Sequence, residues 1–236
     1  MKKAPLLRLL ARLEKHYGAQ EPCWPVDPYE FLVWWHCGYP ASDAACAKGW
    51  EKLVQEVGVS PQQLLDASPG KLGAALRAGG MVPELRAVRL KEIAMRVKDQ
   101  FGGDLRGALS GSIAEVRRIL KRFPGIGDPG ADRILLFAGL SPVAAVPSNT
   151  AHVLPRIRRG VERESYIANY RDAQQATEDE VPKEFSARQR AYLLVKRHGQ
   201  ETCKRTKPRC EVCAIRENCA YFARRAPGNR GSNRSS

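Results

Sequence analysis

Four cysteines close together near the end of the chain constrain the fold more than any other feature. They are Cys203, Cys210, Cys213 and Cys219, in the spacing C-x6-C-x2-C-x5-C. Four thiolates spaced in this way can bind one metal centre, and both Zn²⁺ and a 4Fe–4S cluster accept four cysteines. A zinc ribbon usually has two C-x2-C pairs, and this segment has one. Cysteine chemistry alone leaves iron–sulfur, zinc and four unrelated thiols open.

The other cysteines are placed differently. Cys23, Cys37 and Cys46 lie in the first fifth of the chain and bring the total to seven. A secreted disulfide framework would spread its cysteines more evenly, so we expect three free thiols and one metal site. The basic N-terminus is followed by further charges, and no apolar run is long enough to span a bilayer. We expect a soluble, cytoplasmic protein, associated with the nucleoid if it is bacterial.

The sequence predicts helices almost throughout and no strand. Apolar residues recur at helical spacing, and the segments between them are rich in Gly and Pro. No run of alternating β-branched residues indicates a strand. The predicted helices of the first hundred residues are 6–17, 29–37, 44–57, 61–67, 71–77 and 83–101.

The net charge of +14 comes from 39 Lys and Arg against 25 Asp and Glu. This excess favours a polyanionic partner, because each phosphate that a protein neutralises releases condensed counterions. A membrane surface, or a basic protein without any such partner, would give the same charge. Charge alone therefore does not decide the partner.

A glycine-rich turn joins two predicted helices in the middle of the chain. Residues 114–123 form an amphipathic helix with a basic outer side, and a second helix is expected from near Gly130. The turn between them is Pro124, Gly125, Ile126 and Gly127. Glycine lets a backbone turn tightly, and the free N–H groups at a helix start bind anions such as phosphate. An ordinary helix–turn–helix corner is the alternative.

The basic helix, the turn Pro-Gly-Ile-Gly and the cysteine spacing together resemble the endonuclease III-type DNA glycosylases of the helix–hairpin–helix superfamily. The residues around the cysteines match as well, including Lys207-Pro208-Arg209. The resemblance extends from about Tyr29 to Tyr221. It implies that the four clustered cysteines bind a 4Fe–4S cluster.

The resemblance also implies an all-α fold of two lobes. A six-helix barrel lobe would span residues 24–141 and include the hairpin, and a cluster lobe would combine 1–23 with 142–222. Residues 223–236 are predicted to be a basic, disordered tail. The expected partner is double-stranded DNA with a flipped base, bound by a monomer.

Three groups of residues are expected to contact this DNA. The turn residues Pro124, Gly125, Ile126 and Gly127 would bind its backbone. The loop between the first two cysteines would do the same with Lys204, Arg205, Lys207 and Arg209, although a solvated basic loop is the alternative. Trp34, Trp35 and Tyr39 would border the base pocket or act as a wedge, with core packing as the alternative.

The residues that perform the chemistry in this family have no counterparts here. The lysine that forms a Schiff base aligns with Pro129, and the aspartate that supports departure of the base aligns with Pro147. The glutamine that enters the DNA aligns with Pro40. Proline supplies neither a base nor a nucleophile, so efficient lyase activity is not expected.

Five residues near the missing positions are weaker catalytic candidates. They are Asp128, Asp132, Ser148, Asn149 and His152. Each aspartate also fits a helix terminus or a surface site, and Asp128 is placed to cap the second helix. His152 also fits a phosphate or structural contact.

The leading hypothesis is a base-excision-repair DNA glycosylase that hydrolyses the N-glycosidic bond of a damaged or mispaired base. The alternative is a non-catalytic protein that binds distorted, damaged or abasic DNA on the same scaffold. The sequence does not identify the lesion, because no known pocket residue of the family is present.

Overall fold

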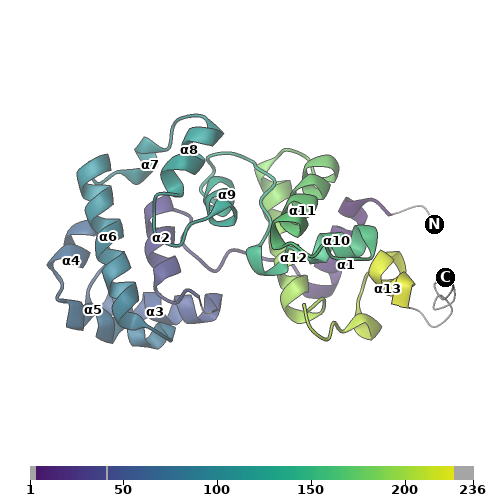
Figure 1. Ribbon diagram of the computed structural model, residues 1–236, viewed down its shortest axis with the longest axis horizontal. Helices are drawn as coiled ribbons and strands as arrows, with labels where there is room; N and C mark the ends of the chain where they lie inside the picture. Colours follow the sequence, from purple (N-terminus) through teal and green to yellow (C-terminus); the bar gives the residue numbers. More distant parts are fainter. Residues whose placement is uncertain (1–3, 41, 226–236) are drawn as a thin grey trace. The chain divides into compact units, whose positions relative to one another are not determined.

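The structure is a computed structural model that describes residues 4–40 and 42–225, and all its regular elements within these ranges are helical (Figure 1). Internal packing divides the chain into two compact units. One unit is Pro22–Ile134, and the other combines the described residues up to Glu21 with those from Leu135 onward. None of the described helices is both long and apolar enough to cross a membrane.

The unit Pro22–Ile134 contains seven complete α-helices among its described residues and the start of an eighth. They are α2 (Pro28–His36), α3 (Asp43–Glu56), α4 (Pro61–Asp66), α5 (Pro69–Leu76), α6 (Pro83–Phe101), α7 (Leu105–Ala108), α8 (Ile113–Leu120) and α9 (Asp128–Phe137), with a 3₁₀ turn η1 (Arg77–Gly79). Side-chain caps begin several of these helices. Asp27 accepts hydrogen bonds from the N–H groups of Tyr29 and Glu30, and Ser112 forms a capping box with Glu115. Local sequence therefore defines where these helices start.

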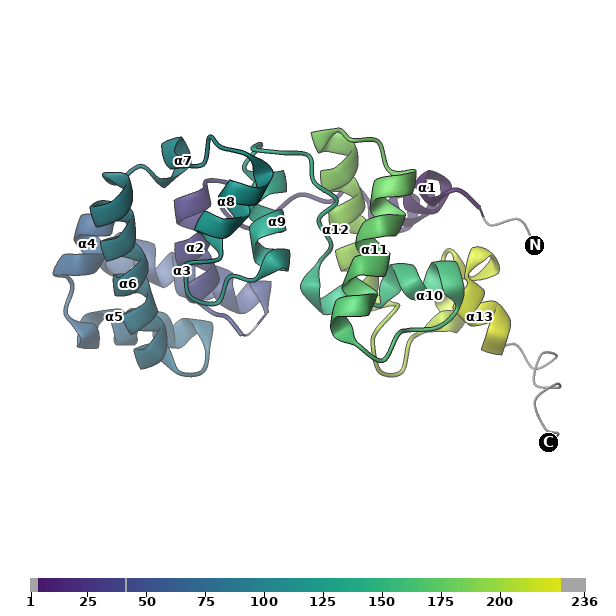
Figure 2. The same ribbon diagram turned by 45° about the horizontal axis from the view of Figure 1, so that its top comes forward.

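The other unit is built from both ends of the chain. Its helices are α1 (Leu6–Tyr17), α10 (Val153–Arg159), α11 (Tyr166–Glu180), α12 (Phe185–Glu201) and α13 (Ala220–Arg225), with 3₁₀ turns η2 (Ser148–Thr150), η3 (Cys210–Val212) and η4 (Arg216–Asn218). In Figures 1 and 2, α10 lies beside both α11 and α13.

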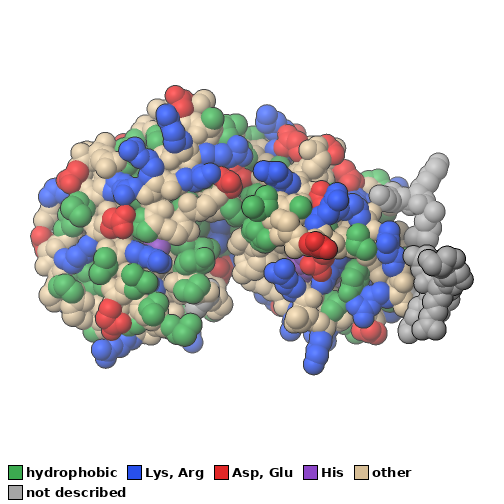
Figure 3. Space-filling model, viewed as in Figure 1, with side chains coloured by type: hydrophobic (Ala, Val, Ile, Leu, Met, Phe, Trp, Pro, Cys, Tyr) green, Lys and Arg blue, Asp and Glu red, His purple; other side chains and the backbone are tan. Residues whose placement is uncertain are grey.

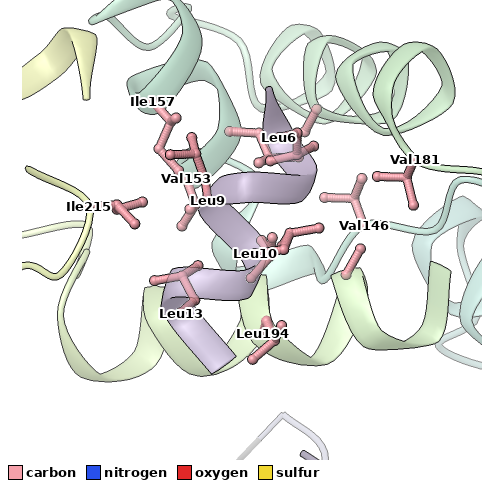
Figure 4. Close-up of a cluster of buried hydrophobic side chains, with 14 of the residues drawn as sticks. Leu6, Leu9, Leu10, Leu13, Val146, Val153, Ile157, Val181, Leu194 and Ile215 are labelled. Carbon is pink, nitrogen blue, oxygen red and sulfur yellow. The ribbon is translucent and has the colours of Figure 1, made fainter. Parts of the chain in front are cut away.

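A leucine face of α1 forms the centre of this second core. Leu6, Leu9, Leu10 and Leu13 recur at helical spacing and are buried, while the opposite face of α1 is charged. Figure 4 shows these side chains meeting Leu194 of α12 and Ile157 of α10. Burial of a leucine side chain contributes about 2 kcal/mol. This face therefore joins the N-terminal segment to the C-terminal helices.

The core of Pro22–Ile134 contains a fully buried arginine. The Arg86 guanidinium donates to the carbonyl oxygens of Leu76 (3.0 Å), Gly80 (2.6 Å) and Cys37, and its Nε donates to Met81 (3.0 Å). Backbone carbonyls thus satisfy the buried charge. A Cβ at Gly79 would lie 1.7 Å from the Cys37 oxygen, so only glycine lets these chain segments approach.

The all-α fold predicted from the sequence is confirmed, with three local corrections. The helix expected over 114–123 ends at Leu120, because residues 121–123 turn into the hairpin. The next helix begins at Asp128, earlier than the expected Gly130. Residues 223–225, expected within the disordered tail, belong to α13, and the rest of that predicted tail lies outside the described residues.

Candidate nucleic-acid interface and cysteine site

The turn between α8 and α9 is anchored on its inner side and open on its outer side. Phe123 and Ile126 are buried, and Ile126 packs against the start of α9 at Gly130. Gly125 has φ +69° and Gly127 precedes the first helical residue; both are exposed. Among the described residues, neither glycine N–H makes a hydrogen bond. These two donors, at the positive end of α9, are suited to an anion.

A histidine of α2 supports the turn from the protein interior. His36 is fully buried, and its Nε2 donates to the carbonyl oxygen of Pro124 at 2.8 Å. Burial, together with the nearby charges of Arg89 and Arg86, lowers the pKa of His36 to about 4. The sequence analysis missed this residue because it lies within an apolar helix. A lone histidine in such a run is the only local signal.

The two aspartates beside the hairpin are both paired with cations of the preceding segment. Asp132 is buried and accepts from Arg117 Nε at 2.6 Å, whereas the exposed Asp128 accepts from Lys121 Nζ at 2.6 Å. Asp128 is the first residue of α9, and among the described residues no helix N–H is found to donate to its carboxylate, so the expected cap is not formed. The Arg117–Asp132 pair joins α8 to α9, whereas the Lys121–Asp128 pair joins the turn to α9.

The aromatic residues of α2 and of the turn after it fall into two environments. Trp34 is 1% exposed and packs against Trp24 and Phe31, which agrees with core packing. Trp35 and Tyr39 are half-buried and stack on each other with ring centroids 4.5 Å apart. The structure thus separates a core tryptophan from an accessible aromatic pair.

A buried arginine of α9 lies against these aromatic rings. The guanidinium carbon of Arg133 is 3.7 Å from the Trp24 ring centroid, and Asp43 lies 3.8 Å from the guanidinium. Close packing over an aromatic face stabilises a cation. This contact fixes α9 against the segment before α2 within the same unit.

The three prolines that the sequence analysis aligned with functional residues of the family occupy ordinary structural positions. Pro129 lies in the first turn of α9, where its missing N–H costs nothing. Pro147 is buried and precedes η2, and Pro40 is exposed after Tyr39. No ionisable side chain stands at any of the three positions.

Ser148 and Asn149, the candidates next to Pro147, lie side by side. The Ser148 hydroxyl donates to Asn149 Oδ1 at 2.9 Å, and Asn149 is exposed. His152, by contrast, donates from Nε2 to the Cys203 carbonyl at 2.7 Å and is buried. The structure gives His152 a structural contact with the cysteine loop.

The four clustered cysteines line one cavity between α10, α12 and the loop that follows α12. Burial raises the pKa of the Cys203 thiol to about 11 and raises the pKa of Cys210 and Cys213 less. No group of three or more His, Cys, Asp or Glu side chains of the described residues converges as around a single metal ion. Each thiolate of a cubane site binds a different iron, so such a site needs cysteines around a cavity. Four thiols around one cavity are a donor set that an iron–sulfur cluster accepts.

Arg156 of α10 holds the backbone of the loop between the first two cysteines. Its guanidinium donates to the carbonyl oxygens of Lys204 and Arg205, each at 2.8 Å, and its Nε donates to Glu162 at 2.7 Å. The loop's basic side chains stay exposed: Lys204, Arg205, Lys207 and Arg209. The anchored backbone thus presents four cations to solvent.

A hydrogen-bonded row of side chains leads from α1 to the cavity. The Tyr17 hydroxyl lies 2.6 Å from Thr202 Oγ1 and 3.0 Å from His198 Nδ1. The other ring nitrogen of His198 lies 3.9 Å from Cys213 Sγ. Burial lowers the pKa of His198 to about 4. The hydrogen bond with Tyr17 thus holds the His198 ring beside Cys213.

The surface agrees with a polyanionic partner. On the face drawn in Figure 3, Lys and Arg side chains recur over both units and are not gathered into one patch. Several basic side chains of the hairpin segment are exposed, among them Arg118, Lys121 and Arg122. The exposed cations therefore lie on the same segment as the free glycine N–H groups.

Sequence comparison finds relatives along most of the chain. Endonuclease III of Thermotoga maritima is 24% identical over 86% of this chain and 87% of its own length. Endonuclease III of Escherichia coli is 25% identical over 94% and 97%. A thymine/uracil-DNA glycosylase of Pyrobaculum aerophilum is 26% identical over 70% and 69%. No family model matches the chain.

Solved structures show the same fold. A non-covalent endonuclease III–DNA complex aligns with a TM-score of 0.72 and 18% identity, covering 93% of this chain and 96% of that one. A thermostable thymine-DNA glycosylase aligns with a TM-score of 0.71 and 20% identity, covering 92% and 96%. The chain therefore has the fold of the helix–hairpin–helix DNA glycosylases. In sequence the chain is similar to endonuclease III, which confirms the predicted resemblance.

Proposed function

We propose that this protein is a base-excision-repair DNA glycosylase that acts without a Schiff-base lyase step. The observation that carries the proposal is the exposed pair of glycine N–H groups at the start of α9, on a scaffold shared with DNA glycosylases. Relatives named endonuclease III and thymine/uracil-DNA glycosylase support the same class of activity.

Two surfaces would bind the DNA backbone. The turn Pro124–Gly127 offers backbone donors to a phosphate, and Lys204, Arg205, Lys207 and Arg209 offer side-chain charge. Double-stranded DNA with the target base flipped out is the proposed substrate, bound by a monomer in the compartment that holds the chromosome. Because phosphate contacts release counterions, binding should fall steeply as salt rises.

The proposed reaction is hydrolysis. Water adds its oxygen to C1′ of the deoxyribose, the bond from C1′ to the base nitrogen breaks, and the base leaves with the water-derived proton. With Pro129 and Pro147 at the family's lysine and aspartate positions, no amine is available there for a Schiff base. Ser148 and Asn149, adjacent to Pro147, are the proposed groups for positioning the attacking water.

We also propose that Cys203, Cys210, Cys213 and Cys219 hold a 4Fe–4S cluster. When bound, the cluster supplies four iron–thiolate bonds that close the loop after α12. That loop has few buried apolar residues of its own, so the bonds would hold its backbone in place. Arg156 and His152 bind backbone carbonyls on the inner side of the loop. The exposed basic side chains of the loop would then face the DNA.

A non-catalytic protein for distorted, damaged or abasic DNA is the second candidate. The specific observation in its favour is that the buried Pro147 aligns with the family's aspartate. Among the described residues, neither Ser148 nor Asn149 beside it has a carboxylate partner. On that reading, the scaffold would recognise deformed DNA and leave the glycosidic bond intact.

Incubation with a panel of lesion-containing and mismatched duplexes, followed by hot alkali, separates the two candidates. A monofunctional glycosylase leaves abasic sites, so strand breaks should appear only after alkali. Breaks without alkali would contradict the absence of a lyase step. Tight binding to a lesion duplex without breaks under either condition would favour the binding protein.

A further inference from the structure

We propose that His36 is a positioning residue that aims the Gly125 N–H group at a DNA phosphate. This inference rests on the proposed DNA-binding role of the hairpin. His36 belongs to α2, far from the hairpin in sequence, and is fully buried beneath it. It therefore acts through the backbone of the turn and does not itself touch DNA.

The orientation follows from the geometry of the peptide unit. The Pro124 carbonyl and the Gly125 N–H belong to one planar trans peptide, so they point in opposite directions. His36 Nε2 donates to this carbonyl at 2.8 Å from the protein interior. The Gly125 N–H must then point outward, where the described structure offers it no partner.

The same hydrogen bond strengthens the outward donor. A carbonyl that accepts a hydrogen bond polarises its peptide, and the N–H of that peptide becomes a better donor. The buried setting of His36 excludes water, so the bond has little competition. The histidine thus supplies both direction and polarity to an anion-binding group.

Packing keeps this arrangement from rotating. A Cβ at Gly125 would lie 3.3 Å from His36 Cε1 and 3.8 Å from Trp35 Nε1, so both rings sit directly against the turn. His36 Nδ1 is buried and has no hydrogen-bond partner among the described residues. Only Nε2 of the ring makes a hydrogen bond, so a side chain that replaces His36 needs a donor only at the position of Nε2.

Three substitutions at position 36 test the proposal. In His36→Gln, the side-chain amide nitrogen can reach the position of Nε2, whereas in His36→Asn it reaches only that of Nδ1. His36→Leu has similar bulk and no donor. Affinity for an undamaged duplex is measured by fluorescence anisotropy over a series of salt concentrations. Tryptophan fluorescence checks folding, because Trp24, Trp34, Trp35 and Trp50 all lie within Pro22–Ile134.

We expect His36→Leu and His36→Asn to weaken DNA binding by about tenfold. This is the effect of losing one charge-assisted hydrogen bond, from the Gly125 N–H to a phosphate. The salt dependence of their DNA binding should correspond to about one phosphate contact fewer. His36→Gln should stay within about threefold of the natural protein. Equal affinity and slope in all four proteins would overturn the proposal, and so would equal weakening in Gln and Leu variants that are folded.

A fourth variant separates this inference from the proposed hairpin function. Gly127→Val places a side chain beside the second free N–H without touching His36, because only Pro129 lies within 4 Å of a Cβ there. Weakened binding in Gly127→Val, with His36→Leu unaffected, would overturn the role of His36 alone. Unchanged binding in Gly127→Val would show that DNA docks elsewhere, and both proposals would fall.

Discussion

Arg117 of α8 and Asp132 of α9 face each other across the hairpin, with Nε 2.6 Å from the carboxylate oxygen. The aspartate is 1% exposed, whereas the arginine side chain keeps about a third of its surface in water (36%). The pair fixes the distance between the two helices that carry the turn. A catalytic carboxylate would need access to substrate, so the burial of Asp132 fits a structural role.

The first prediction concerns this pair. Asp132→Asn should lower the free energy of unfolding of Pro22–Ile134 by about 2–3 kcal/mol, because a buried carboxylate that accepts a charged donor is removed. Asp128→Asn is the matched control, since its exposed pair with Lys121 should contribute less than about 1 kcal/mol. Urea unfolding followed by tryptophan fluorescence measures both. Equal losses would show that burial does not distinguish the two pairs.

The second prediction concerns the two glycines of the turn. Gly125→Ala should destabilise the unit by about 1–2 kcal/mol, since φ is +69° and the new methyl group meets His36. Gly127→Ala meets only Pro129, at 3.8 Å, so its stability should stay close to that of the natural protein. Thermal unfolding of both variants checks the contrast. A stable Gly125→Ala would mean that the turn adapts.

The third prediction concerns the metal. Protein purified without oxygen should be yellow-brown and contain about four irons per chain. Cys213→Ser should lose most of this iron and its visible absorbance. Cys23→Ser, an exposed thiol of the other unit, is the control and should keep both. Stoichiometric zinc in place of iron would contradict the cluster.

The fourth prediction concerns covalent trapping. Borohydride should not trap the natural protein on abasic DNA, because trapping requires a Schiff base and position 129 is proline. Pro129→Lys alone, or Pro147→Asp alone, should give slight trapping, and the double variant should give clearly more. A gel-resolved protein–DNA adduct measures the outcome. Strong trapping by the natural protein would mean that another lysine performs the attack.

The fifth prediction concerns acid stability. Burial lowers the pKa of His36 from 6.5 to about 4, so the unfolded chain binds this proton more readily than the folded chain. Above pH 6.5 His36 is neutral in both states, so its titration leaves the free energy of unfolding unchanged. Between pH 6.5 and 4 the free energy of unfolding should fall by up to about 3 kcal/mol. His36 is the one histidine of Pro22–Ile134. Tryptophan-monitored unfolding of His36→Gln should show a flatter dependence in that window, and an equal slope would contradict the assignment.

Features defined by neighbouring residues were predictable from the sequence. The helices expected over 6–17 and 83–101 match α1 and α6, because leucine spacing defines the first, and a starting proline and a final glycine bound the second. The hairpin and the cysteine spacing are likewise local patterns. The end of α8 was misplaced because residues 121–123 continue the apolar pattern while their backbone already turns.

Contacts between distant segments were not predictable from one sequence. His36 and Pro124 are 88 positions apart, and no local pattern pairs a histidine with a particular carbonyl. The same holds for Arg156, which reaches the loop backbone at Lys204 and Arg205. Arginine-rich helices are usually read as solvated, and burial against carbonyl groups depends on the folded neighbours. The sequence therefore indicated the cysteine cluster and the turn, but it did not indicate the residues that hold the backbone of these two segments.

The pairing of α1 with α12 fixes an order of events during synthesis. Tyr17 and its partner His198 are 181 residues apart, so the leucine face of α1 emerges from the ribosome long before its binding surface exists. At translation rates of 5–20 residues per second, this delay is roughly 10–40 s. Pro22–Ile134 is continuous and can fold within that interval. The nascent chain thus carries an uncovered apolar helix, a binding site for chaperones, until its last third is made.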